Sequence, residues 1–134
     1  MNPILYRLYT SRLWALLLAL TGRVNAGAYV GRGHWMTLRQ AQACVGPGWA
    51  GLIKTGFTRC LKHLAPIFQI KEKFGGLRFY STVGMGDIED QSYFICEECG
   101  KPGTLRDTGW WKTLCDECAK PEVRLRRREW RWQR

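Results

Sequence analysis

The chain has 134 residues, which is enough for one compact core with an attached module but too few for two large domains. Hydrophobic residues make up 46% and aromatic residues 13% of the sequence, which excludes a disordered composition. Lysine and arginine number 21 against 11 acidic residues, and the net charge of +10 favours a polyanionic partner, either nucleic acid or an anionic membrane surface.

The N-terminal segment, residues 1–26, is open to three interpretations. Arg7 and Arg12 precede an apolar run at 13–20, and residues 24–26 resemble a cleavage site, so one interpretation is a secretory signal peptide. The apolar run is too short to span a membrane, which takes about 20 apolar residues. A second interpretation is a basic amphipathic helix that contacts a membrane surface or a partner.

The third interpretation, which we favour, treats residues 1–35 as an extension and begins the domain near Met36. Gly27, Gly31 and Gly33 are typical of a flexible boundary between the two parts. A reduced cysteine site further along the chain also fits a cytoplasmic protein better than a secreted one.

A helix is predicted over residues 48–64, because apolar residues recur there at spacings of three and four and Pro66 then ends the pattern. The predicted buried stripe consists of Trp49, Leu52, Ile53, Phe57, Cys60, Leu61 and Leu64. Since Cys60 belongs to this stripe, we expect a small core residue and not a reactive thiol.

A β-hairpin is predicted next, with strands at 66–71 and 77–83 and a turn at 72–76. Gly75 and Gly76 can adopt the positive φ angles that such a turn needs. We expect this hairpin to pack against the preceding helix.

The hairpin is followed by a break at residues 84–86 and by a predicted helix over residues 88–95, with Asp87 as its N-cap. The predicted fold is therefore α+β, with a helix and β-hairpin domain over residues 36–95.

Four cysteines in two C-x₂-C pairs then predict a metal site: Cys96, Cys99, Cys115 and Cys118. Two such pairs complete a tetrahedral set of four sulfur ligands, which suits one structural Zn²⁺ ion, with iron as the chemical alternative. A closed four-sulfur shell leaves no position for a reactive water, so we expect a structural and not a catalytic metal.

The residues between the cysteine pairs predict a second hairpin, with strands at 104–106 and 110–114 and a turn at 107–109. A cysteine knuckle, a hairpin and a second pair at the start of a helical turn are typical of treble-clef and zinc-ribbon modules. We assign this module to residues 96–120 and a basic tail to residues 121–134.

Two motifs resemble a known pattern. The segment IKEKFGGLRFY at residues 70–80 is followed by Cys96-x-x-Cys99-Gly100-x-Pro102-Gly103 and by Leu114-Cys115-Asp116-x-Cys118. In this the chain resembles an uncharacterised family of small bacterial and phage proteins, in which a helix and a KEKFGGLRFY-type hairpin precede a zinc-finger-like module. The resemblance covers about residues 45–119, and it implies the fold and the metal but no particular reaction.

Most enzyme classes that use such a frame need residues that this sequence lacks. His34 and His63 are the two histidines and both lie outside the cysteine module. The H-x-E and P-C-x-x-C motifs of nucleobase deaminases do not occur, nor do nucleotide-binding glycine patterns. A nucleophilic pair would have to combine Cys44 or Cys60 with a histidine, so we expect a binding protein and not an enzyme.

Nucleic-acid binding is predicted from two basic surfaces. Arginines of the tail can contact phosphates while its tryptophans stack on bases, although a solvated basic helix is the alternative. The tail candidates are Arg124, Arg126, Arg127, Arg128, Trp130, Arg131 and Trp132. The second surface is Lys71, Lys73 and Arg78 at the hairpin turn, reinforced by Arg106 and Lys112 of the second hairpin.

The competing prediction is an adaptor or inhibitor that docks on a host protein complex. Trp110 and Trp111 form an apolar pair on the second hairpin, and alternation along the strand directs one of them away from the core. An exposed tryptophan is a typical anchor at protein interfaces.

Overall fold

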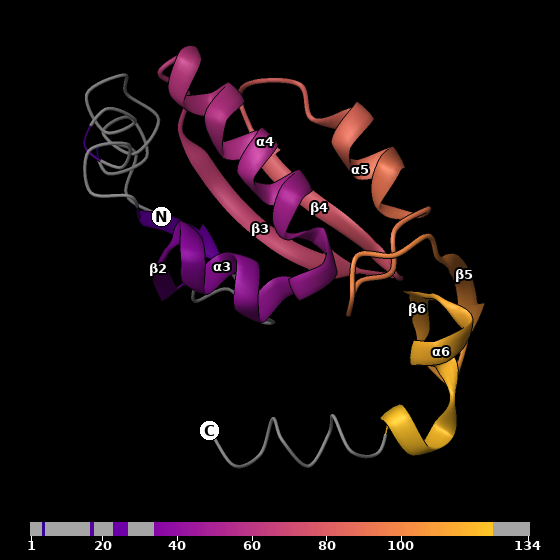
Figure 1. The fold of residues 1–134 in the computed structure, drawn as a ribbon. Helices are drawn as coiled ribbons and strands as arrows, with labels where there is room; N and C mark the ends of the chain where they lie inside the picture. The colour runs from indigo at the N-terminus through magenta and orange to yellow at the C-terminus, as the bar shows by residue number, and fades with distance from the viewer. Residues whose placement is uncertain (1–3, 5–16, 18–22, 27–33, 125–134) are drawn as a thin grey trace.

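The computed structural model describes Ile4, Leu17, Arg23–Ala26 and residues 34–124. The described part is a mixed α+β fold in which helices and β-hairpins precede a C-terminal cluster of four cysteines (Figure 1). The elements in chain order are β1 (Arg23–Ala26), β2 (His34–Thr37), α3 (Leu38–Val45), the 3-10 turn η1 (Pro47–Trp49), α4 (Ala50–Lys62), β3 (Ile67–Lys73), β4 (Gly76–Ser81), α5 (Gly86–Ser92), β5 (Thr104–Asp107), β6 (Trp111–Leu114) and α6 (Asp116–Ala119).

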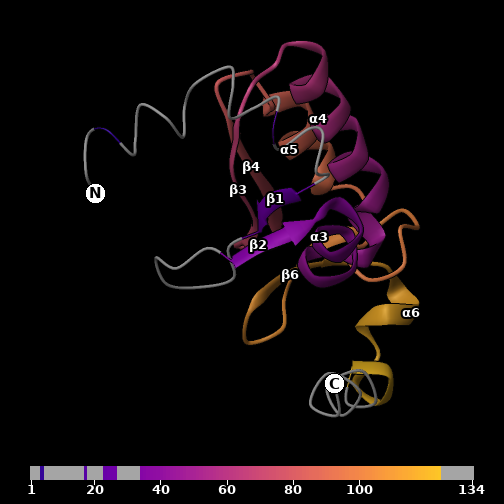
Figure 2. The ribbon, with the colours of Figure 1, turned by 90° about the vertical axis from the view of Figure 1, so that its left-hand side faces the viewer.

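The first hairpin, β1–β2, leads directly into α3, and β1 lies beside β3 (Figure 2). The helix begins at a capping box, in which the Gln40 N–H donates to Thr37 Oγ1 at 3.2 Å and the Thr37 N–H donates to Gln40 Oε1 at 3.0 Å. The boundary predicted near residue 35 falls inside β2, and the division of the chain into 1–35, 36–95, 96–120 and 121–134 stays a prediction.

The helix expected over residues 48–64 is divided into η1 and α4. Pro47 occupies the first position of η1, where its fixed φ and missing N–H are tolerated. Leu64 has a φ of +47°, which ends the helical segment before Pro66. The prediction that Leu61 and Leu64 are buried is wrong: the two residues are 44% and 39% exposed, whereas the neighbouring Cys60 and Ala65 belong to the core.

The second hairpin, β3–β4, forms as predicted, with small shifts at its ends. Its turn is made by Phe74 and Gly75, whose φ angles are +53° and +76°. Positive φ at both central residues is the property of a type I′ turn, which matches the twist of the flanking strands. The expectation of a positive φ at Gly76 is wrong, since Gly76 is already the first residue of β4.

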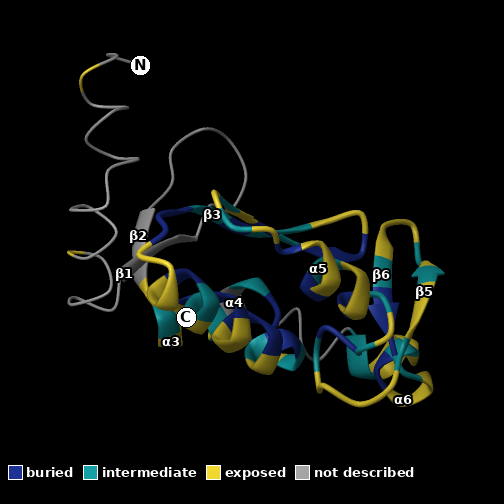
Figure 3. Ribbon diagram, turned by 90° about the horizontal axis from the view of Figure 1, so that it is seen from above, coloured by how far each residue is buried: buried dark blue, intermediate teal, exposed yellow. Residues whose placement is uncertain are grey.

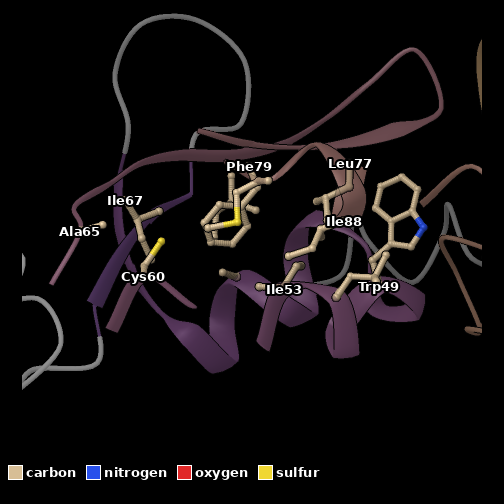
Figure 4. Packing of buried hydrophobic residues seen from close by; sticks show 12 residues of the cluster. Trp49, Ile53, Cys60, Ala65, Ile67, Leu77, Phe79 and Ile88 are labelled. Atoms are coloured by element: carbon tan, nitrogen blue, oxygen red, sulfur yellow. The ribbon is translucent and has the colours of Figure 1, made fainter. Parts of the chain in front are cut away.

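The main core lies between the β3–β4 hairpin and the helices α4 and α5, and the buried face of α4 is turned towards the hairpin (Figures 3 and 4). The members labelled in Figure 4 are Trp49, Ile53, Cys60, Ala65, Ile67, Leu77, Phe79 and Ile88. Cys60 is buried as expected, and burial raises the pKa of its thiol, which lies 3.2 Å from Ser81 Oγ. A neutral, hydrogen-bonded thiol of this kind acts as a small core residue.

The helix α5 begins at Gly86 with Met85 as its N-cap, so the prediction of Asp87 as the N-cap is wrong. The Asp87 carboxylate instead accepts two hydrogen bonds from Arg59 of α4, with nitrogen–oxygen distances of 2.7 and 2.8 Å. This bidentate pair joins the two helices at their exposed edges.

Candidate metal centre

The first cysteine pair sits on a tight loop between α5 and β5. The Cys96 N–H donates to Lys101 O at 2.8 Å, and the Gly100 N–H donates to Cys96 O at 3.0 Å. These bonds fold the chain back on itself, so that the side chains of Cys96 and Cys99 point to one side of the loop. This loop is the knuckle predicted from the C-x₂-C spacing.

The second pair lies at the start of α6. Cys115 is the N-cap of this short helix, and the Cys118 N–H lies 3.4 Å from the Cys115 sulfur. The Ala119 N–H also donates to Cys115 O at 3.0 Å. A helical turn therefore holds the second pair, which is the placement expected for the module.

The four cysteine sulfurs form one cluster, since their Sγ atoms all lie within 4.8 Å of one another. The Sγ atoms of Cys99 and Cys115 are 3.7 Å apart. A tetrahedral Zn²⁺ ion with Zn–S bonds of about 2.3 Å places its sulfur ligands about 3.8 Å apart. The cluster therefore fits one zinc ion with all four predicted ligands.

The environment of the sulfurs is asymmetric. Cys96 and Cys118 are buried, Cys115 is partly buried and Cys99 is exposed. The N–H of Cys118 lowers the pKa of the Cys115 thiol to about 7, whereas desolvation of the sulfur, which is only partial at exposed Cys99, raises the pKa values of Cys99 and Cys118. Desolvation opposes thiolate formation at these two residues, and a bound divalent cation would offset that cost.

The module is attached to the helix and hairpin domain by hydrogen bonds between distant segments, from both backbone and side-chain donors. The Gly48 N–H donates to Glu97 O at 2.8 Å, next to the first cysteine. Thr113 of β6 is buried and donates its hydroxyl to Gly75 O at 2.6 Å, at the turn of the β3–β4 hairpin. The Trp49 indole N–H donates to Ile95 O at 2.9 Å. The four-cysteine cluster is therefore built onto the end of the main core.

A buried carboxylate beside the cysteines was not predicted from the sequence. Glu97 follows the first ligand, yet it is buried and forms an ion pair with Lys112 of β6. Burial raises the pKa of Glu97 and the ammonium of Lys112 opposes this shift. Arg106 is likewise paired with Asp116 of α6. Arg106 and Lys112, expected to reinforce a nucleic-acid surface, therefore lie in ion pairs within the module.

The structure places Lys71 and Lys73 on the same face of β3, the face opposite to buried Ile70. Their ammonium groups lie 5.2 and 5.4 Å from the ring centroids of Tyr80 and Phe74 respectively. These contacts leave both charges at the surface of the hairpin.

The third predicted residue of this surface, Arg78, is directed elsewhere. It lies opposite Lys71 in the strand register, but its guanidinium donates to the Tyr93 hydroxyl at 2.8 Å. The same group lies 4.0 Å from the carboxylate of Glu89 on α5. Arg78 therefore joins β4 to the segment that follows it.

Of the tail candidates, Arg124 lies within the described residues, in a helical turn at 121–124. Its guanidinium donates to Thr108 O at 3.2 Å, so this turn lies against the tip of the β5–β6 hairpin. Arg126, Arg127, Arg128, Trp130, Arg131 and Trp132 lie outside the described residues, and their role stays a prediction.

Both tryptophans of the β5–β6 hairpin are exposed, where alternation predicted one. Trp110 is 52% and Trp111 is 46% exposed, because Trp110 belongs to the turn and Trp111 lies near the tip, beyond the buried Thr113.

His63, the histidine nearest to Cys60 in the sequence, is an exposed C-cap of α4.

Comparison with family models, with curated proteins and with solved structures gives no match for this chain. The resemblance to small bacterial and phage proteins therefore stays a prediction, and the four-cysteine cluster is the part of it that the structure supports. Within Ile4, Leu17, Arg23–Ala26 and residues 34–124, no helix combines the length and apolar character needed to cross a membrane.

Proposed function

We propose that this chain is a small zinc-stabilised protein that binds nucleic acid and catalyses no reaction. The observation that carries the proposal is the pair Lys71 and Lys73, which share one face of the β3–β4 hairpin and have no ion-pair partner among the described residues. With a net charge of +10, such groups favour phosphate contacts.

The role of the metal in this proposal is to hold the cysteine module in shape. The module's own buried apolar cluster is small and consists of Cys96, Leu114 and Cys118. Coordination by four thiolates supplies the folding energy that such a small core lacks. The ordered β5–β6 hairpin then supports the turn at 121–124, from which the arginine-rich segment continues.

The metal assignment is tested by metal analysis of the reduced protein, with one zinc per chain expected. Cys99→Ser is the informative variant, because Cys99 is exposed and its loss removes a ligand without opening the core. We expect Cys99→Ser to lose zinc and Cys60→Ala, the matched control outside the cluster, to keep it. Stoichiometric zinc in Cys99→Ser would contradict the assignment.

Nucleic-acid binding is tested by titrating duplex and single-stranded probes at several salt concentrations. We expect affinity to fall steeply with salt, and Lys71→Gln with Lys73→Gln to reduce the slope of log K against log salt by about 0.9 for each phosphate that is no longer neutralised. Removal of residues 123–134 tests the tail in the same assay. Binding that is absent, or insensitive to salt, would exclude the proposal.

A second candidate, a protein-docking adaptor or inhibitor, is favoured by the exposure of Trp110 and Trp111. Phe74, at the turn of the β3–β4 hairpin, is 60% exposed. The Leu105 side chain of β5 packs on the next residue, Gly75, so apolar groups of both hairpins lie near this turn. Capture of a protein from lysate that survives nuclease and high salt, and that is lost in Trp111→Ala, would favour this candidate over nucleic acid.

A further inference from the structure

The outer face of α4 carries a shallow basic groove that the sequence patterns did not indicate. Its described lining comes entirely from this helix and its C-cap. The lining residues are Lys54, Thr55, Thr58, Arg59, Lys62 and His63. These residues lie on the side of the helix away from the hairpin core, and all of them except Arg59 are exposed.

The charge of this groove is carried by two lysines. No acidic residue occurs anywhere in α4. Arg59 is neutralised by its bidentate pair with Asp87. Lys54 and Lys62, in contrast, have no ion-pair partner among the residues that the structure describes. Two uncompensated ammonium groups therefore face solvent along one helix.

The spacing of these lysines follows from helical geometry. Lys54, Thr58 and Lys62 are four residues apart and lie on one side of α4, so the two lysine positions are about 12 Å apart along the axis at 1.5 Å per residue. The major groove of B-form DNA is also about 12 Å wide. A helix lying across that groove brings one lysine to the phosphates at each edge.

The other lining groups favour recognition by charge alone. The hydroxyls of Thr55 and Thr58 donate to backbone carbonyls within the helix at 3.0 and 2.9 Å, so their protons are already used. The described lining contains no aromatic side chain on which an unpaired base could stack. Single-stranded sites depend on such stacking, whereas duplex backbone contacts need only positive charge.

We infer that this face of α4 binds the phosphate backbone of duplex DNA, with Lys54 and Lys62 as the contacting groups. The inference rests on the proposed nucleic-acid binding and gives it a second surface. The α4 surface is separate from Lys71 and Lys73, because α4 covers one face of the β3–β4 hairpin and these two lysines lie on the other face (Figure 3).

The test compares the variant Lys54→Gln with Lys62→Gln to a control, Lys101→Gln with Arg39→Gln, in the full zinc-loaded chain. Both variants lose two charges from exposed positions, but the control residues do not line the groove. In titrations of a short duplex we expect the α4 variant to reduce the salt slope by about two and to weaken binding on the order of tenfold near physiological salt. We expect the control variant to change much less.

The outcomes separate the inference from the function on which it rests. If the unmodified chain binds no nucleic acid, both are overturned. If it binds duplex and the α4 variant matches the control variant, the inference alone is overturned. A loss seen with phosphatidylserine vesicles, but not with the duplex, would assign the α4 face to a membrane surface and also overturn the inference.

Discussion

Gly48 lies against the cysteine knuckle with no room for a side chain. A Cβ atom added there would lie 1.9 Å from Cys96 O and 2.5 Å from the Gly100 nitrogen, so a side chain would push the knuckle out of place. We expect Gly48→Ala to weaken zinc binding and to lower the free energy of unfolding by about 1–3 kcal/mol, the usual cost of overpacking.

The matched control for this prediction is Gly51→Ala. A Cβ at Gly51 meets no atom within 4 Å, and the residue lies inside α4, where alanine is favoured over glycine by about 1 kcal/mol. The free energy of unfolding, measured with denaturant, should therefore fall in Gly48→Ala and rise in Gly51→Ala. In chelator competition, only Gly48→Ala should release zinc more readily than the parent. Equal zinc affinity in the two variants would show that the close approach at Gly48 does not constrain the metal centre.

Asp87 gives the stability a defined pH dependence. The hydrogen bonds from Arg59 lower the pKa of Asp87 to about 2, below the value near 3.9 of an unfolded chain. A depressed carboxyl pKa stabilises the folded state above about pH 4, and this contribution is lost as the pH falls from about 4 to about 2.

We therefore expect Asp87→Asn to be less stable than the parent at pH 7 and to match it near pH 2. Urea unfolding of both proteins after chelation removes the metal's own pH dependence from the comparison. Asp90→Asn, an exposed carboxylate on the same helix without an ion-pair partner among the described residues, is the control. A difference between Asp87→Asn and the parent that is constant with pH would contradict the assignment.

At the scale of the elements, side chains of α5 accept hydrogen bonds from backbone N–H groups at the outer edge of β4. The Leu77 N–H of β4 donates to Ser92 Oγ at 2.9 Å, and the Phe79 N–H donates to Glu89 Oε1 at 2.8 Å. These N–H groups point away from β3 and would otherwise be unpaired at a strand edge. The helix thus replaces a third strand.

This arrangement makes Ser92 a structural residue. Ser92 is fully buried, so Ser92→Ala leaves the Leu77 N–H buried without an acceptor, and we expect a loss of about 1–3 kcal/mol in the free energy of unfolding. Gln91→Ala, at an exposed neighbouring position, should change it by less than about 0.5 kcal/mol. Similar unfolding midpoints for the two variants would show that the Leu77 N–H does not depend on Ser92 as its hydrogen-bond acceptor.

The sequence predicted the positions of α4 and β4 better than the hydrogen bonds at the outer edge of β4. The spacing of three and four between apolar residues indicated α4, and alternation at Leu77 and Phe79 indicated the inward face of β4. The acceptors for the β4 edge were not predictable, because Glu89 and Ser92 lie on the next helix and polar residues there look like an ordinary solvated face. The same reason explains Asp87, whose partner Arg59 is 28 residues away.

At the scale of the whole molecule, the cysteine spacing predicted the candidate site well because each C-x₂-C pair is a local structure. The attachment of the site was not predictable. It depends on Gly48 contacting Glu97 and on Thr113 contacting Gly75, contacts between segments far apart in the sequence. No periodicity or local motif encodes such contacts, since they exist only after both parts have folded.

The two parts differ in what holds them together, and this leads to a prediction about metal removal. The helix and hairpin domain has its own core, which includes Ile53, Ile70 and Phe79, whereas the buried apolar cluster of the module consists of two cysteines and Leu114. On the proposed zinc binding, we expect a segment with so small a core to fold only when the metal is bound. Chelation under reducing conditions should therefore unfold the module and leave the main core folded but less stable.

Hydrogen exchange measured with and without chelator tests this order of events. We expect the amides of Cys96, Glu97 and Gly100, which are bonded within or to the module, to lose protection first. Amides in the centre of β3 and β4 should stay protected, because the bonds between these strands do not involve the module. If protection falls equally in both parts, the chain is one cooperative unit governed by the metal; if the module keeps its protection, the cysteines are not what folds it.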